Sequence, residues 1–183
     1  MITSIPTRYK GYNFRSRTEA RWAVYFDAIG CDWEYEPDGF ILPDGSKYLP
    51  DFYLKSVSMW AEVKPGWPTD EEIKKAVMLS AGSGAEVLFL DGTPRQANYW
   101  AVCACRYTNS PIVLSSGEEL HTAYWNDFYL SDQYLCERRF YSCTGGDEES
   151  FGPDRPDNLY FGLEEPVNAA RSARFEFGES GRS

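Results

Sequence analysis

Hydrophobic positions recur at helical spacing over residues 16–29. The apolar side chains lie three or four positions apart and would share one face of a helix; they are Trp22, Ala23, Phe26 and Ile29. Ser16 stands at the start with Glu19 three positions later, which is a capping-box pattern, and Gly30 follows the last apolar position. The pattern predicts a helix over residues 16–29.

A second helix is predicted over residues 70–81. Thr69 is a suitable N-cap, and acidic residues occupy the first turn, where the helix dipole favours them. The expected inner face comprises Ile73, Ala76, Val77, Leu79 and Ser80.

Shorter stretches have the alternation or compact apolar runs typical of strands. Residues 40–42 and 47–49 flank a Pro-Asp-Gly-Ser turn and predict a hairpin, whose second arm we expect to continue into 51–54. Further strands are predicted over residues 32–37, 59–64 and 87–90. This order of elements favours an α/β protein with a mixed central β-sheet flanked by helices.

The second half of the chain has weaker patterns. Residues 99–106 and 111–114 are possible strands, and the aromatic-rich stretch 120–134 is interpreted as helical. Residues 144–158 are acidic and rich in Gly and Pro, which predicts a loop. Pro166–Phe175 is expected to form the last helix. We therefore expect a core in residues 1–94 and a C-terminal extension in residues 95–183.

Composition narrows the functional classes. No run of 18 apolar residues occurs, and the first residues lack the apolar segment of a secretory signal, so we expect a cytoplasmic protein without a membrane span. Five cysteines and a single histidine, without zinc spacing, favour reduced thiols over a disulfide framework or a zinc site.

Charge is uneven along the chain. The net charge of −10 argues against a non-specific DNA coat, because such proteins depend on attraction to phosphates. The first 21 residues are nevertheless basic, with no acid before Glu19; the basic residues are Arg8, Lys10, Arg15, Arg17 and Arg21.

Three residues on adjacent predicted strands carry the most informative chemistry. Glu62 and Lys64 lie two apart on one strand and so point to the same face, and pairing of strands 51–54 and 59–64 would bring Asp51 beside Glu62. Two close carboxylates favour a cation between them, and Mg²⁺ suits this donor set, with the Val63 carbonyl as a further ligand. A cross-strand salt bridge is the simpler alternative.

These residues resemble a known motif. Pro50-Asp51 and Glu62-Val63-Lys64 are similar to the signature of the PD-(D/E)XK nuclease superfamily, and residues 15–22 resemble its first core helix, with Glu19 at the position of an additional acid. The similarity covers about residues 8–92. The chain also resembles small uncharacterised phage and bacterial proteins that carry an Ala-Arg-x-x-Arg-Phe-Glu segment, here residues 170–176.

The resemblance implies a restriction-endonuclease-like αβββαβ core and a metal-dependent DNA endonuclease of a phage or mobile element, acting in the bacterial cytoplasm. Asp51, Glu62 and Glu19 would ligate Mg²⁺ or Mn²⁺, and Lys64 would position the attacking water or stabilise the phosphorane. The DNA backbone would be contacted by Arg15, Arg17 and Arg21.

Two alternatives remain at this stage. The same fold would serve as a catalytically silent protein-interaction or structural module, which the acidic balance favours. The second alternative is a nuclease subunit that needs a partner protein or a second copy of itself. Trp60 and Trp67 flank the central strand, and we expect them to pack in the core or at its rim rather than stack on bases.

Overall fold

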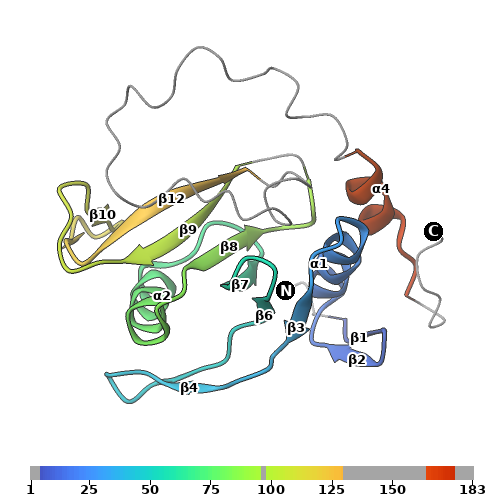
Figure 1. Cartoon of the computed structure of the whole chain (residues 1–183), viewed down its shortest axis with the longest axis horizontal. Helices are drawn as coiled ribbons and strands as arrows, with labels where there is room; N and C mark the ends of the chain where they lie inside the picture. The colour runs from blue at the N-terminus through green and yellow to red at the C-terminus, as the bar shows by residue number, and fades with distance from the viewer. Residues whose placement is uncertain (1–4, 96–97, 130–163, 176–183) are drawn as a thin grey trace, which may run out of the picture.

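The computed structural model describes residues 5–95, 98–129 and 164–175 (Figure 1). Within them the chain is a mixed α/β protein with three helices, namely α1 (Arg17–Ala28), α2 (Asp70–Ser83) and α4 (Glu164–Ser172). The strands of the first half are β1 (Thr7–Tyr9), β2 (Tyr12–Phe14), β3 (Trp33–Tyr35), β4 (Phe40–Ile41), β5 (Lys47–Tyr48), β6 (Phe52–Leu54), β7 (Met59–Lys64) and β8 (Val87–Asp91). They are followed by β9 (Asn98–Ala104), β10 (Ile112–Val113), β11 (Glu119–Leu120) and β12 (Ala123–Tyr129).

Six strands form one mixed sheet in the order β12-β9-β8-β7-β6-β3. Only β7 and β8 are parallel neighbours in it, and α2 provides the crossover that a parallel pair requires. The mixed sheet is as predicted. Strands β9 and β12 come after residue 94; β9 pairs with β8 and β12 pairs with β9, so the sheet includes both halves of the chain.

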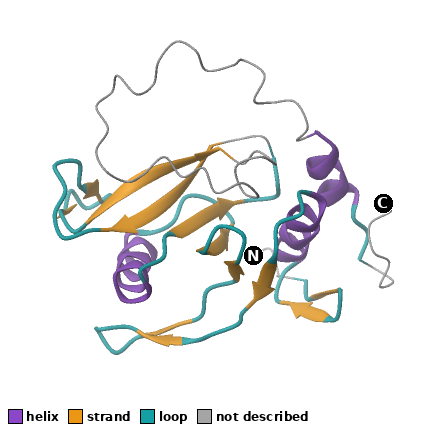
Figure 2. Cartoon of the chain, in the orientation of Figure 1, coloured by secondary structure: helices purple, strands orange, loops and turns teal. Residues whose placement is uncertain are grey.

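Helices cover the two faces of this sheet (Figure 2). Helices α1 and α4 lie side by side on one face, over a core rich in aromatic side chains such as Trp22, Phe26 and Phe52. Helix α2 packs on the other face, where Ile73 and Leu79 contact the second core. Strand β7 contributes side chains to both cores, because successive side chains of a strand point to opposite faces of the sheet.

Helix α1 forms as its sequence predicts. The Ser16 hydroxyl accepts a hydrogen bond from the Glu19 backbone N–H at 3.1 Å and caps the first turn. Gly30 follows the helix with φ of 69°, a left-handed conformation that glycine adopts without strain. The predicted apolar face is buried, with Trp22 and Phe26 fully enclosed.

The helical interpretation of residues 120–134 is wrong for the described part of that stretch. Residues 119–120 form β11, and residues 123–129 form β12, which pairs antiparallel with β9. The stretch contains several aromatic residues, and aromatic side chains fit the pleated surface of a sheet well. Residues 130–134 lie outside the described residues.

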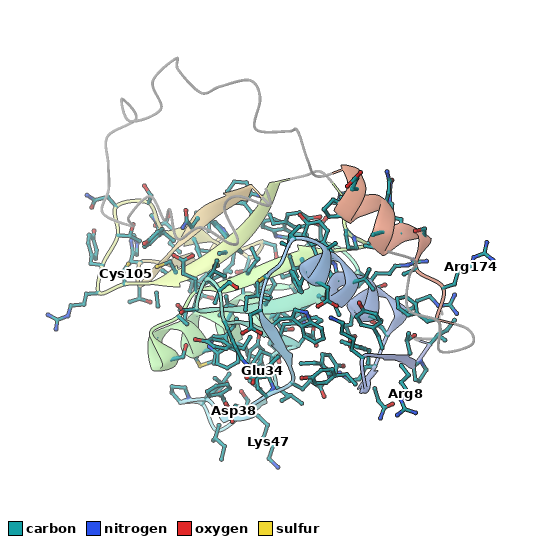
Figure 3. The ribbon with its side chains drawn as sticks, turned by 45° about the vertical axis from the view of Figure 1, so that its right-hand side comes forward. Arg8, Glu34, Asp38, Lys47, Cys105 and Arg174 are labelled. Atoms are coloured by element: carbon teal, nitrogen blue, oxygen red, sulfur yellow. The ribbon has the colours of Figure 1, made fainter. Side chains whose placement is uncertain are left out.

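The expected continuity of the hairpin into residues 51–54 is also wrong. Strands β4 and β5 pair with each other as a separate two-stranded sheet, whereas β6 pairs with β3 and β7 in the main sheet. Pro50 separates β5 from β6 and lacks the N–H that a continuous ladder would use. Asp38 and Lys47 point from this arm into solvent (Figure 3).

The remaining predictions are met in part. The strand expected over 99–106 is β9, and 111–114 contains the short β10. The last helix exists but begins at Glu164 and ends at Ser172, with Pro166 in its first turn, where its missing N–H is tolerated. The loop expected over 144–158 lies outside the described residues, as does Glu176. Among the described helices, none has the length and apolarity needed to cross a membrane.

The C-terminal cap of α2 gives a test of this local structure. Gly84 has φ of 71° at the cap, whereas Gly82 lies within the helix with open space where a Cβ would go. Gly84→Ala should lower the free energy of unfolding by about 1 kcal/mol, and Gly82→Ala should raise it by about 0.5–1 kcal/mol. Urea unfolding measures both, and equal effects of the two substitutions would contradict the assigned cap.

Candidate active site

Two of the sequence-predicted acids, Asp51 and Glu62, meet where β6 begins and β7 ends, and the third, Glu19, lies near Asp51 at the start of α1. Asp51 immediately precedes β6, Glu62 lies on β7, and Glu19 approaches from α1. All three are buried, with exposed fractions of 4%, 4% and 8% respectively. Burying carboxylates is costly unless other groups compensate their charge, so their immediate partners decide what the site can do.

Asp51 is held on both carboxylate oxygens. Its Oδ2 accepts a hydrogen bond from the Val63 backbone N–H at 2.8 Å, and its Oδ1 accepts one from Arg15 Nη2. Burial raises the pKa of Asp51 to about 7, and the nearby charges of Glu62 and Glu19 add to this effect. The Val63 N–H and the Arg15 guanidinium oppose it. Asp51 therefore carries a proton over part of the neutral range.

Glu62 and Lys64 point to the same face of β7, as the alternation predicts. Glu62 Oε2 lies 3.1 Å from Lys64 Nζ, and the same ammonium lies 2.9 Å from Glu72 Oε1. Burial raises the pKa of Glu62, although Lys64 opposes the rise. Burial acts to lower the pKa of Lys64, but the charges of Glu62 and Glu72 outweigh it and the pKa is raised. Lys64 is accordingly protonated at neutral pH.

Glu19 lies in the first turn of α1 and is also near Asp51. Its Oε2 accepts hydrogen bonds from the Tyr35 hydroxyl at 2.6 Å and from the Arg15 backbone N–H at 3.1 Å, while Oε1 accepts one from the Ser16 hydroxyl at 2.7 Å. Burial and this bond to Glu19 raise the pKa of Tyr35, so Tyr35 remains a donor. Glu19 thus belongs to the start of α1 and also faces Asp51.

The three arginines predicted to face DNA have different surroundings. Arg15 forms ion pairs with Asp51 and, through Nε at 2.6 Å, with Glu36, while 56% of its side chain stays exposed. Arg17 and Arg21 are half-buried on α1. Arg8, another residue of the basic N-terminal segment, points into solvent from β1 (Figure 3). Arg15 is therefore the arginine that is integrated into the acid cluster.

Sequence reasoning missed two members of the cluster, Tyr48 and Glu72. Burial and the charge of Glu62 raise the pKa of the Tyr48 phenol, which approaches this site from β5. Its hydroxyl is near enough to lower the pKa of Glu62, yet among the described residues neither that hydroxyl nor Glu62 Oε1 makes a hydrogen bond of ordinary geometry. Tyr48 resembles any strand tyrosine in the sequence, so no local signal marks it.

Glu72 does have a signal in the sequence, although it indicates a different role. It lies three positions after Thr69, and the structure has both hydrogen bonds of a capping box between these two residues. Its second oxygen is free to reach Lys64 because α2 begins close to the end of β7. The cap is predictable from spacing, but the contact with Lys64 depends on the fold.

The oxygen atoms of this cluster are of the chemical type that a hard divalent cation binds. Asp51, Glu62 and the Val63 carbonyl offer oxygen ligands, and the buried Glu62 Oε1 lacks a hydrogen-bond partner within the described chain. Within the same residues, no three Asp, Glu, His or Cys side chains are gathered closely enough to form a metal cage. Arg15 supplies the positive charge next to Asp51 in this arrangement.

The raised pKa of Asp51 predicts a pH-dependent stability. An acid whose folded pKa lies above its unfolded value stabilises the fold at low pH and loses that contribution as pH rises toward the folded value, here from about 4 to 7. Asp51→Asn should remove this loss, so that its unfolding free energy rises relative to the wild type by on the order of 2 kcal/mol between pH 4 and 7.

Urea unfolding of both proteins across this pH range checks the effect. Asp44→Asn is the control, because hydrogen bonds from Ser46 lower the pKa of that exposed turn residue and it titrates below this window. A difference between Asp51→Asn and the wild type that stays constant from pH 4 to 7 would contradict the raised pKa.

Comparison with protein families and with curated proteins adds no relationship. No family model matches the chain, and no curated protein matches it significantly. The similarity of Pro50-Asp51 and Glu62-Val63-Lys64 to a nuclease motif therefore rests on these residues and on their positions around β6 and β7.

Proposed function

We propose that this protein is a Mg²⁺- or Mn²⁺-dependent DNA endonuclease with a PD-(D/E)XK site on a restriction-endonuclease-like core. The observation that carries the proposal is the burial of Asp51 and Glu62 on neighbouring strands with Lys64 on the same face as Glu62. Both carboxyl pKa values are raised, which a divalent cation between the carboxylates would reverse.

The order of elements supports the same proposal. Helix α1, strands β3, β6 and β7, helix α2 and strand β8 follow one another as the αβββαβ core requires, with the β4–β5 arm inserted before β6. Beyond it, β9 and β12 extend the sheet and α4 packs beside α1. The proposed setting is a phage or mobile-element system in the bacterial cytoplasm.

The roles of the side chains follow from their contacts. Asp51, Glu62 and the Val63 carbonyl would hold the metal ion, which when bound neutralises phosphate charge and lowers the pKa of a water ligand. Lys64 donates hydrogen bonds to a non-bridging phosphate oxygen or orients the attacking water. Glu19 would add to the metal site directly or through water, and hydrogen bonds from Ser16 and Tyr35 fix the position of its carboxylate.

Arg15 has a place in the same scheme. It offsets the charge of Asp51 through their ion pair. If a metal ion compensated that charge instead, the exposed Arg15 side chain would be able to contact a DNA phosphate. Arg17 and Arg21 are proposed to contact the backbone further along α1. A homodimer or a partner protein would supply the additional basic surface that a single acidic chain lacks for duplex binding.

One contact favours the alternative of a catalytically silent interaction module. The Asp51–Arg15 ion pair already satisfies an oxygen that would ligate the metal, as in a site retained only for structure. Metal-dependent cleavage decides between the two functions.

Removal of Lys64 should abolish cleavage without unfolding the protein. Lys64→Ala is expected to lower the rate of plasmid nicking by at least about 100-fold in Mg²⁺ or Mn²⁺, because the charge that stabilises the transition state is lost. Lys74→Ala is the matched control on the surface of α2, where the exposed Lys74 forms an ion pair with Glu118. The proposal fails if wild-type protein cuts no form of DNA with either metal, or if Lys64→Ala retains full activity.

Glu72 is expected to act as a positioning residue for Lys64. Glu72→Gln preserves the capping box, since Gln can replace Glu there, but removes one of the two charges that raise the pKa of Lys64. The alkaline limb of the pH–rate profile should therefore move to lower pH, with a rate loss of about threefold to tenfold at neutral pH. Glu71→Gln, on an exposed residue paired with Lys75, should leave the profile unchanged. An unshifted profile for Glu72→Gln would contradict the role.

A further inference from the structure

Three tryptophans meet on the α2 face of the sheet beside the candidate active site. Trp67 lies in the loop after β7, Trp100 on β9 and Trp125 on β12. The Trp67 ring centre is 5.2 Å from that of Trp125 and 6.4 Å from that of Trp100. Trp67 packs at the rim of the sheet, as expected from the sequence, but it is 61% exposed, so packing leaves a large flat aromatic surface that faces outward. We call these three residues the tryptophan cluster.

A small cavity adjoins the tryptophan cluster. It measures about 100 Å³ and is bounded by Trp67, Trp100, Phe89 and Asp91, with Pro68 and Tyr99 completing the wall. Pro65 and Pro68 flank Trp67 on either side, which limits the conformations of its loop. The backbone of the loop is therefore restricted, and contacts with Trp100 and Trp125 help to hold the exposed ring.

The cavity lies one strand away from Glu62 and Lys64 of the candidate active site. In the parallel pairing of β7 and β8, Glu62 lies opposite Phe89 and Lys64 opposite Asp91. The Lys64 carbonyl also accepts a hydrogen bond from the Gly92 N–H at 2.7 Å. Two residues that line the cavity are thus the cross-strand neighbours of one proposed metal ligand, Glu62, and of Lys64. A group bound in the cavity would lie one strand away from the scissile bond.

The walls of the cavity suit a nucleobase. Trp67 and Trp100 offer aromatic surfaces, and the Asp91 carboxylate with its partner Arg95 offers an acceptor and donors at the edge. Bases within a duplex are paired and stacked on one another, so only an unpaired base can stack on a protein ring. Stacking also does not depend on net charge, which matters for a chain of net charge −10.

We propose that the tryptophan cluster binds an unstacked base next to the cleaved phosphate, so that the substrate is DNA with unpaired nucleotides. This inference rests on the proposed nuclease function for its position in the reaction, but base binding can be measured without cleavage. Affinity then comes from aromatic stacking rather than from a long row of phosphate contacts.

The test measures binding of fluorescein-labelled (dT)15 to the full chain by anisotropy, with a chelator present so that no cleavage occurs. A fully abasic oligomer of the same length has the same phosphates and no bases. Wild-type protein should bind (dT)15 more tightly than the abasic oligomer, and Trp67→Ala should weaken (dT)15 binding about tenfold while leaving abasic binding unchanged. Trp67→Phe should retain most of the affinity, because it keeps a stacking surface.

Tyr107→Ala is the matched control. Tyr107 is 69% exposed and stacks on His121 beyond the opposite end of β9 from Trp100, so its loss should not change binding. The inference is overturned if Trp67→Ala binds (dT)15 like the wild type, if wild-type protein binds the abasic oligomer equally well, or if a blunt duplex competes as effectively as (dT)15.

The binding and cleavage experiments separate the two proposals. Cleavage by wild-type protein with no effect of Trp67→Ala on (dT)15 binding would overturn the base site and leave the nuclease proposal standing. Binding of (dT)15 that depends on Trp67, in a protein that cuts no DNA, would support the base site and overturn the nuclease proposal.

Discussion

Two carboxylates buried side by side, Asp51 and Glu62, are the constraint around which this end of the protein is organised. Leaving a buried charge uncompensated costs several kcal/mol, so each carboxylate needs partners from other parts of the chain. Arg15 and the Val63 N–H serve Asp51, and Lys64 serves Glu62. Both pKa values are still raised, so the compensation is incomplete. Additional positive charge at this position would therefore stabilise the two carboxylates.

The sheet explains why this constraint is met at one place. The carboxyl ends of the parallel strands β7 and β8 meet at one edge, where ligands commonly bind in α/β proteins. Lys64 and Asp91 end these strands, and the loop after β7 carries Trp67. Helix α2 begins just beyond, so Glu72 both caps that helix and contacts Lys64. One edge of the sheet therefore joins the acids, the lysine and the exposed tryptophan.

The acidic net charge and the proposed DNA substrate are compatible in this arrangement. Long-range attraction to a duplex requires many free basic side chains, and Arg15 is occupied by Asp51 and Glu36. Aromatic stacking acts at short range and does not need a positive surface. An acidic nuclease with an aromatic surface beside its site would thus favour DNA whose bases are already exposed.

The sequence determined the local elements and the chemical types at the site. Capping patterns and apolar spacing predicted α1 and α2, because these signals involve residues only a few positions apart. Alternation placed Glu62 and Lys64 on one face, and the pairing of β6 with β7 was expected from their proximity in the chain. The helical prediction for residues 120–134 failed over the described part because its aromatic residues follow no clear period, and the pairing of β12 with β9 decides the conformation of residues 123–129.

Only the tertiary structure decided which distant residues join the site. Arg15 reaches Asp51 across 36 positions, and Tyr48 and Glu72 approach Glu62 and Lys64 from a separate arm and from a helix. The tryptophan cluster likewise combines one loop with two strands of the second half. Such contacts depend on strand order and on the packing of helices onto the sheet, and no spacing along the chain encodes them. Sequence fixes which groups are present, and the fold fixes which of them meet.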